Sequence, residues 1–422
     1  MPGPLDGIRI LEFTQIIAAP FGGMLLSDMG AEVIKVEPIE GEPWRLHNQF
    51  LPKESRYYIS LNRGKKSLPL NLKSPEATSI VHRLVKEIDV VIINARPDVP
   101  EKLSTDYETL SKINPALIYC DNTAFGRNGP DSYRPGYDIV VQAVSGLLAA
   151  DNKVENGVPQ QVSATAIADY STGIAIAWSV CAALFARERS GMGQKIDTNL
   201  LSTALSMQSS FMELDSYTKE TRLEFLDTLN ALKQAEMPYE AMLEQQRSLA
   251  GPTAAFRIYY TTYKTLNGII AIGCLSEHLR KKAAVVMGIQ DPRFEPGYNP
   301  EDPATIAQIE ALHESSKLIM ESLPTEEWLM KFDEAGVPAG PVRFVQELLD
   351  DEQVLANEMV VELQHSKAGI IRMAGPMVRM SETPLQPQSA SPALGEHTEE
   401  ILASLGYTDE VISGFKERGI TM

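Results

Sequence analysis

The chain has 422 residues, of which 44% are hydrophobic and 22% charged, a balance typical of a soluble globular protein with room for two or three domains. Its net charge of −18 argues against nucleic acid as a partner, because binding phosphates requires clustered lysine and arginine. The N-terminus lacks the basic and apolar regions of a secretion signal, and no apolar run approaches the ~20 residues of a membrane span, so we expect a cytoplasmic protein without a membrane partner.

The cysteines and histidines indicate neither a disulfide framework nor a metal site. The three cysteines are odd in number, lie far apart and have apolar neighbours, which is typical of small core residues. The six histidines show no ligand-pair spacing. We therefore expect no bound metal.

The first part of the chain alternates predicted strands with predicted helices. Residues 7–13 are typical of a buried strand, a helix should run from Pro20 to about Met29, and residues 31–38 predict a second strand. Further strands are predicted at residues 66–72, 89–94 and 116–122. This alternation implies an α/β fold with a largely parallel sheet and with ligands at the carboxyl ends of its strands.

A long helix is predicted to begin at Asp169. Aspartate is among the best N-cap residues, because its side chain accepts an otherwise unpaired backbone N–H of the first turn. Apolar residues follow at three- and four-residue spacing, which predicts a buried stripe that consists of Ile174, Ala177, Trp178, Cys181, Leu184 and Phe185. Arg187, Arg189 and Gly191 end the helix. Taken alone, this segment favours a structural cap over a catalytic role for Asp169.

The remaining segments predict a second, smaller domain. Residues 206–250 are helical and polar and form a linker, whereas residues 251–344 predict an α+β domain that contains a hairpin folded about Asn267 and Gly268. Residues 345–422 should return to the first domain and complete it. The large domain, residues 1–205, is therefore expected to be Rossmann-like.

Local motifs indicate no nucleotide cofactor. The strand, helix and strand that end at Glu37 have the outline of a nicotinamide-dinucleotide fold, but the first turn, TQIIAAP, lacks the glycines that let the backbone approach a pyrophosphate. Phosphate-loop, zinc-protease and nucleophile-elbow motifs are also missing. A dehydrogenase remains an alternative that failure to bind NAD would exclude.

Six segments together resemble one family over nearly the whole chain. They are PLDGIRILEFTQIIAAPFGGMLLSDMGAEVIKVEP near the start, NRGKKSLPLNLKSPE at residues 62–76, GYDIVVQAVSGL at 136–147, ADYSTGIAIAWSVCAALFARERSGMGQKIDTNLL at 168–201, AGVPAGPV at 335–342 and LGEHTEEIL at 394–402. The sequence resembles the family III CoA transferases of the CaiB/BaiF type, the superfamily that includes formyl-CoA transferase and the carnitine-type CoA transferases.

The resemblance implies a covalent mechanism at one residue. In that family the nucleophile is an aspartate at the head of the helix after the GYD segment, and the matching residue here is Asp169. A helix N-terminus stabilises an anion, so we expect Asp169 to be ionised. Its attack on a succinyl-CoA-like donor would lead to an aspartyl-CoA thioester, from which CoA passes to a small carboxylic acid, such as a dicarboxylate, without ATP, metal or a tightly bound cofactor.

The resemblance also implies where acyl-CoA binds in the large domain. CoA carries several phosphates and an adenine, so its site should combine basic residues with strand-end loops. The candidates are Ile16, Ile17, Ala18, Leu70, Lys73, Asn94, Ala95, Lys102, Arg134 and Tyr137. Arg45, Arg56 and Arg257 are candidates to hold a distal carboxylate of the acceptor. The family further implies an intertwined homodimer in which each chain threads through the other.

Departures from the family pattern leave alternatives open. Formyl-CoA transferase has a glutamine where this chain has Ile17 and a glycine-rich loop where this chain reads SLAGPTAAFRIYY, so the resemblance does not extend to formyl and oxalate specificity. The racemase branch carries Gly-His-Asp where this chain has Gly136, Tyr137 and Asp138, which leaves a 2-methylacyl-CoA racemase as an alternative. A non-catalytic CoA-binding subunit of a heteromeric transferase, with Asp169 only a cap, would bind CoA without turnover.

Overall fold

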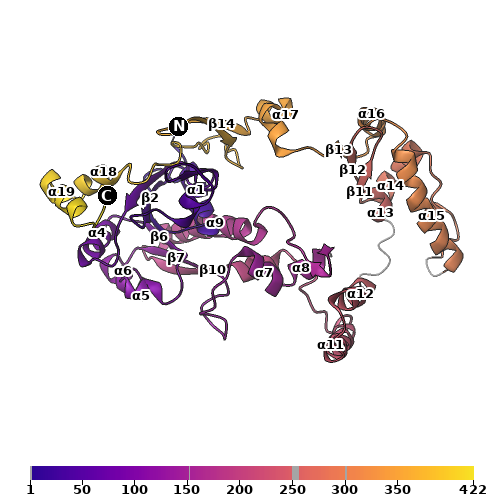
Figure 1. The fold of residues 1–422 in the computed structure, drawn as a ribbon, viewed down its shortest axis with the longest axis horizontal. Helices are drawn as coiled ribbons and strands as arrows, with labels where there is room; N and C mark the ends of the chain where they lie inside the picture. The colour runs from indigo at the N-terminus through magenta and orange to yellow at the C-terminus, as the bar shows by residue number, and fades with distance from the viewer. Residues whose placement is uncertain (1, 152, 250–255, 300–301) are drawn as a thin grey trace. The chain divides into compact units, whose positions relative to one another are not determined.

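The computed structural model describes residues 2–151, 153–249, 256–299 and 302–422 (Figure 1). Contacts divide the chain into two compact units. The first unit comprises Met1–Glu220 together with Leu349–Met422, and the second comprises Thr221–Leu348. Each unit has its own hydrophobic core.

The first unit is built around a parallel sheet of six strands in the order β10-β7-β6-β1-β2-β5. The strands are β1 Arg9–Phe13, β2 Glu32–Glu37, β5 Lys65–Pro69, β6 Val90–Ile93, β7 Ile118–Thr123 and β10 Gln194–Asn199. The sheet confirms the predicted α/β class and five of the strands. The edge strand β10 was not predicted, because Ile196 is its only apolar residue.

Helices cover both faces of this sheet. On one face α1, Ala18–Asp28, and α9, Ile167–Ser190, pack with the strands into one apolar core. On the other face a second core includes residues of α4 Pro75–Val85, α6 Tyr107–Ile113, α18 Thr398–Ser404 and α19 Asp409–Glu417. The C-terminal segment thus contributes two helices to the first unit.

The contact between α1 and α9 depends on glycine. A Cβ added to Gly173 would lie 2.7 Å from the carbonyl oxygen of Ala18, and one added to Gly22 would lie 2.8 Å from Cγ2 of Ile176. Both distances are too short for a real side chain. The two helices therefore approach backbone to backbone, and the turn of α9 that follows Asp169 lies directly against the start of α1.

The predicted buried stripe of α9 is wrong in part. Ala177 and Leu184 are buried as expected, but Ile174, Trp178 and Phe185 are 45%, 63% and 60% exposed within this chain. The close approach of α1 selects small residues for the buried face, and the large side chains lie on the opposite face. Among the described helices, α9 also has the length and hydropathy of a membrane span, contrary to expectation, although half of that stretch is buried in the unit.

Smaller elements of the first unit form its loops and additions. They are α2 Pro43–Leu46, β3 Gln49–Leu51, β4 Glu54–Ser55, α3 Arg56–Ile59, α5 Val99–Lys102, α7 Asp138–Val144, α8 Leu147–Asp151, β8 Val154–Glu155, β9 Val158–Pro159, α10 Leu200–Ser206, α17 Glu352–Ala356, β14 Val360–His365 and β15 Gly369–Ala374. A 3-10 helix, Val345–Asp350, spans the border of the two units.

The second unit contains the predicted hairpin and helices. Strands β11 Tyr260–Lys264 and β12 Ile269–Gly273 pair antiparallel about Asn267 and Gly268, and β13, Ala339–Pro341, completes a sheet of three strands. Its helices are α11 Lys219–Gln234, α12 Tyr239–Leu249, α13 Phe256–Tyr259, α14 Glu277–Met287, α15 Pro303–Met320 and α16 Thr325–Ala335, with a 3-10 turn at Pro292–Phe294. Part of the SLAGPTAAFRIYY segment, residues 250–255, lies outside the described residues.

Candidate active site

A cavity of about 860 Å³ opens at the carboxyl ends of four neighbouring strands of the first unit. Its lining comes from the segments that end or follow β1, β2, β5 and β6. Four of the predicted CoA-binding residues lie in this lining: Leu70, Lys73, Asn94 and Ala95. The structure therefore brings these four together at the sheet edge where the parallel topology placed ligands.

Lys102 belongs to the adjoining surface. It borders a second pocket of about 750 Å³. Four residues line both this pocket and the larger cavity: Leu72, Lys73, Val99 and Leu103. Its Nζ lies 2.7 Å from Asp98 Oδ2, and both side chains are accessible to solvent. Lys73 and Lys102 thus lie on one continuous surface around the cavity mouth.

Asp138 organises the start of α9. It is the first residue of α7, and its Oδ1 accepts the backbone N–H groups of Ala168, at 2.8 Å, and of Asp169, at 3.2 Å. Its Oδ2 accepts a hydrogen bond from the side-chain amide of Gln142. The residue at the N-cap position of α9 is Ala166, whose side chain makes no capping bond. A carboxylate from another helix therefore binds two backbone N–H groups in the first turn of α9.

The prediction that Asp169 is the N-cap is wrong. Asp169 is the third residue of α9, so the helix begins earlier than its sequence suggested. The physical reason is the side chain of Asp138, which accepts the N–H groups that a local cap would otherwise accept. With the capping role taken by another residue, a cap no longer explains an aspartate at position 169.

Asp169 lies in an environment that disfavours its charge. Its side chain is buried, with 8% of the residue exposed. Burial, and to a smaller extent the negative charge of Asp138, raise the pKa of the Asp169 carboxyl to about 7. Burial together with the charge of Asp169 also raises the pKa of the neighbouring Tyr170. Asp169 is therefore less readily ionised than the helix terminus alone led us to expect. Desolvation and like charge outweigh the helix terminus, whose effect is typically ~0.3–1 kcal/mol.

The loop between β1 and α1 joins the cavity to the start of α9. Thr14 and Gln15 line the cavity. Ala18 begins α1, its carbonyl lies beside Gly173, and its side chain shares an apolar cluster with Ala168, the residue before Asp169. This loop contains three predicted CoA contacts, Ile16, Ile17 and Ala18. They therefore lie between the strand-end cavity and the start of α9.

Two predicted CoA contacts lie outside these cavities. Tyr137 is 63% exposed and precedes Asp138 at the N-cap of α7. Arg134 is half exposed, with its Nη1 3.6 Å from Asp131 Oδ1 and its guanidinium 5.7 Å from the ring centroid of Phe125. Both residues stand in the segment that leads to Asp138, and neither borders the strand-end cavity.

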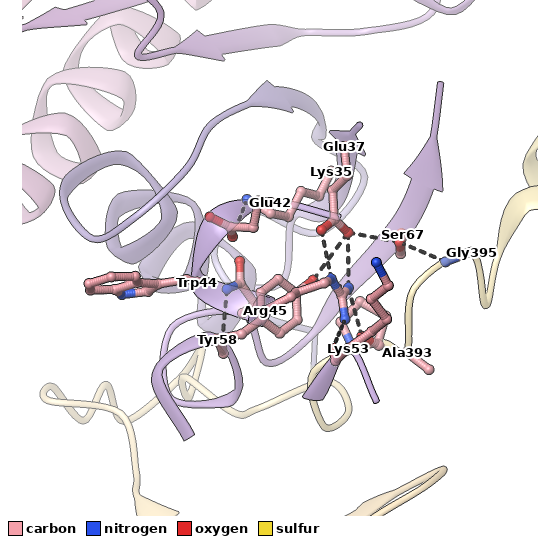
Figure 2. Close-up of polar contacts among 12 residues, drawn as sticks. Lys35, Glu37, Glu42, Trp44, Arg45, Lys53, Tyr58, Ser67, Ala393 and Gly395 are labelled. Atoms are coloured by element: carbon pink, nitrogen blue, oxygen red, sulfur yellow. Dashed lines mark hydrogen bonds and ion pairs between the residues drawn. The ribbon is translucent and has the colours of Figure 1, made fainter. Parts of the chain in front are cut away.

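The three arginines suggested for a distal carboxylate differ in their surroundings. Arg45 is fully buried, and its Nε and Nη2 bind the carboxylate of Glu37 at 2.7 and 2.9 Å (Figure 2). It is therefore committed to the protein's own carboxylate, and the suggestion that it holds substrate is not supported. Arg56 is exposed at the start of α3. The side chain of Arg257 lies outside the described residues.

Sequence reasoning assigned no role to Asp138 or Glu42. Asp138 stands in the GYD segment that carried the family resemblance, which was a signal for the residue itself but not for its contact with the first turn of α9. Glu42 lines the cavity and binds the β1–α1 loop, which nothing in its local sequence indicated. Among the described residues, no group of three or more His, Cys, Asp or Glu is arranged to hold a metal ion.

Comparison with known proteins identifies one family. A sequence profile described as CoA-transferase family III matches residues 5–398. The chain is 32% identical over 421 residues to succinyl-CoA:glutarate CoA-transferase from Homo sapiens, covering 99% of this chain and 90% of that protein. It is 33% identical over 420 residues to succinate–glutarate CoA-transferase from Agrobacterium fabrum, covering 95% and 96%. A crystal structure of a CAIB/BAIF family protein from Brucella suis aligns with a TM-score of 0.74 at 29% identity, covering 96% and 100%.

Proposed function

We propose that this chain, which belongs to CoA-transferase family III and is therefore an enzyme that transfers CoA, uses Asp169 as the nucleophile and forms an aspartyl-CoA thioester. The observation that carries the proposal is the position of Asp169. It is a buried carboxyl at the start of α9, it is not used as a cap, and one loop connects its surroundings to a strand-end cavity. The cavity's volume of about 860 Å³ is within the range of ligand pockets.

The first half of the reaction moves CoA from the donor to the enzyme. A carboxylate oxygen of Asp169 attacks the thioester carbonyl, the C–S bond breaks, and CoA leaves as a thiolate from a mixed anhydride. The thiolate then attacks the carbonyl carbon of Asp169. The anhydride C–O bond on that carbon breaks, the donor acid leaves as a carboxylate, and CoA remains bound to Asp169 as a thioester.

The second half repeats these steps with the acceptor. Its carboxylate attacks the aspartyl-CoA thioester, expels the thiolate and forms a second mixed anhydride. The thiolate attacks the acceptor's carbonyl carbon, which yields the new acyl-CoA and returns Asp169 to its carboxylate. No net proton, electron or water is consumed, and one thioester replaces another, so the proposed reaction balances without ATP. None of its steps uses a metal or a tightly bound cofactor.

The environment of Asp169 suits this chemistry. A carboxylate that is poorly solvated and close to another negative charge is a stronger nucleophile than one stabilised by water. With a pKa of about 7, Asp169 is ionised in a large fraction of molecules at neutral pH. The Asp138 carboxylate holds the turn in place through two backbone N–H groups while it raises the energy of the reacting charge.

For the substrates we propose a succinyl-CoA-like donor and a small dicarboxylate acceptor. Two relatives that the chain matches over nearly its whole length carry names that pair succinyl-CoA or succinate with glutarate. Glutarate differs from succinate by one methylene group, so one site that accepts a short dicarboxylate would serve both halves of such a reaction.

We also propose that the enzyme is a cytoplasmic homodimer. The exposed side chains of Ile174, Trp178 and Phe185 support a homodimer, because they lie along one helix and leave about half or more of their surface exposed within a single chain. A second copy of the chain that covers this face would remove it from water.

The mass of the intact protein tests the aspartyl intermediate. The protein is incubated with succinyl-CoA and other acyl-CoAs without an acceptor, and its mass is recorded under mild conditions beside Asp169→Ala and Asp169→Asn. We expect the wild type to gain the mass of CoA less one water and both variants to gain nothing. If CoA binds but no donor adds mass to the wild type, Asp169 is not the nucleophile.

A further inference from the structure

Ile16, in the loop between β1 and α1, has a backbone conformation that isoleucine rarely adopts. Its φ is +71°, in the left-handed region, where a β-branched side chain is sterically disfavoured. Among the described non-glycine residues with positive φ, Ile16 is the only β-branched one. Such a conformation persists only where the surrounding structure imposes it, and it is most often found at functional sites.

Glu42 binds the backbone of this strained residue. Its side chain is 1% exposed, and its Oε2 accepts the N–H of Ile16 at 2.9 Å, across 26 residues of chain. Its other oxygen, Oε1, lies 3.2 Å from Nζ of Lys35. Figure 2 shows Glu42 and Lys35 beside the buried Glu37–Arg45 pair. Glu42 thus connects a buried charge cluster to a single amide of the strained loop.

The two residues before Ile16 are held in the same way. Nζ of Lys35, which is also fully buried, donates to the carbonyl oxygen of Thr14 at 2.8 Å. The side-chain amide of Asn94 accepts the N–H of Gln15 at 3.0 Å and donates to its carbonyl at 2.8 Å. Three side chains from three different segments therefore fix three consecutive residues of this loop.

A purely stabilising role does not explain Glu42 well. Burial raises the pKa of its carboxyl, which means that desolvation opposes the charged form that the N–H and Lys35 bind. Buried ion pairs contribute little net stability, because the desolvation of both charges offsets their attraction. The contact is better explained by what it positions, since the loop lies between the strand-end cavity and the start of α9.

We propose that Glu42 is a positioning residue for CoA transfer: by binding the Ile16 N–H it fixes the β1–α1 loop so that the acyl-CoA thioester is presented to Asp169. The inference rests on the proposed function. It predicts that loss of Glu42 affects the chemical steps more than the binding of acyl-CoA, because the other residues of the cavity lining remain while the alignment of the reacting carbonyl is lost.

The chain offers a matched control in Glu54. It is another fully buried glutamate of the same unit, its Oε2 lies 3.7 Å from Nη1 of Arg45, and its other ion-pair partners are His365 and Lys367. No described contact joins Glu54 to Thr14, Gln15 or Ile16. Replacing Glu54 therefore removes another buried carboxyl group and leaves the loop's own contacts in place.

The experiment compares Glu42→Ala and Glu42→Gln with Glu54→Ala and Glu54→Gln. For each we would measure kcat, KM for succinyl-CoA, the rate at which the aspartyl adduct forms in a single turnover, and hydrogen exchange in the peptide that contains Ile16. For Glu42→Ala we expect kcat and the adduct rate to fall roughly ten- to a hundredfold with KM little changed. Glu42→Gln should be intermediate, because its amide oxygen can still accept the N–H. The Glu54 variants should keep the wild-type kcat.

Several outcomes would overturn the inference. A Glu42→Ala enzyme with wild-type kcat, a loss confined to KM, or equal losses in the Glu42 and Glu54 variants would each do so. Should Glu42→Ala fail to fold, Glu42→Gln carries the same comparison. Hydrogen exchange separates this inference from the proposed function: even if the wild type transferred no CoA, faster exchange at Ile16 in the Glu42 variants alone would support the positioning contact, and unchanged exchange would refute it.

Discussion

Asp138 holds Asp169 by its backbone and opposes the charge of its side chain. Its carboxylate accepts the N–H of Asp169 at 3.2 Å, and its negative charge adds to burial in raising the pKa of the Asp169 carboxyl to about 7. One residue therefore fixes the position of the proposed nucleophile and tunes its ionisation.

Replacing Asp138 by asparagine should separate these two effects. The amide oxygen of Asp138→Asn can still accept the two N–H groups, and only the bond from Gln142 is lost together with the negative charge, so the pKa of Asp169 falls. Because the carboxylate is the reactive form, the acidic limb of the kcat profile should move to lower pH. It should remain above the limb of a solvated aspartate, since burial persists.

The matched variant is Asp138→Ala, which loses both the charge and the cap. It should also lower the free energy of unfolding by about 0.5–2 kcal/mol, as the loss of an N-cap does. An acidic limb that stays in place in Asp138→Asn would show that the charge of Asp138 does not act on the reacting group.

The raised pKa of Asp169 also predicts how stability depends on pH. The unfolded chain releases this proton near pH 4 and the folded chain near pH 7, so between these values the folded state binds more protons. The contribution of Asp169 to stability therefore decreases as the pH rises from about 4 to 7. At pH 8 the buried charge is a cost that Asp169→Asn removes.

We accordingly expect Asp169→Asn to be inactive and more stable than the wild type at pH 8, by roughly 1–4 kcal/mol. At pH 4 the two proteins should be nearly equal in stability. Denaturant unfolding at both pH values measures this. Equal stability at pH 8 would mean that the carboxyl is well solvated in the folded protein.

Much of the fold could be predicted from the sequence. Strand β6 is a continuous apolar run, and β1 and β2 each combine short apolar stretches with charged residues, so these three strands were evident. The hairpin at Asn267 and Gly268 carried its own turn signal. The buried face of α9 could not be predicted, because it is set by the close approach of α1 at Gly173 rather than by the apolar pattern of α9.

The site was predicted less completely. Asp169 was identified through the family resemblance, while local sequence alone favoured a cap. Its true surroundings depend on Asp138, which lies 31 residues earlier, and the loop at Ile16 depends on Glu42, 26 residues later. Neither contact has a periodic or local signature, since each is made only when separate segments fold together.

The glycine at position 173 provides a test of how closely α9 must approach α1. An alanine there would place its Cβ 2.7 Å from the backbone oxygen of Ala18, which no side-chain rotation can relieve. We expect Gly173→Ala to destabilise the protein by about 1–3 kcal/mol and to lower kcat, since the displaced turn carries Asp169. Gly340→Ala, where a Cβ meets nothing within 4 Å, is the control and should change neither quantity.

The conformation of Ile16 predicts that glycine can replace part of what Glu42 does. Glycine adopts a positive φ without steric cost, so in Ile16→Gly the loop no longer needs the same restraint. The loss of kcat caused by Glu42→Ala should therefore be several-fold smaller in the Ile16→Gly background than in the wild type, as an interaction between contacting residues requires. A double-mutant cycle on the rate of adduct formation measures this coupling, with Glu54→Ala in the same background as the control. If the rate losses of Ile16→Gly and Glu42→Ala are additive in the double variant, the two residues are not coupled. Glu42 would then act on the rate by some route other than the strain at Ile16.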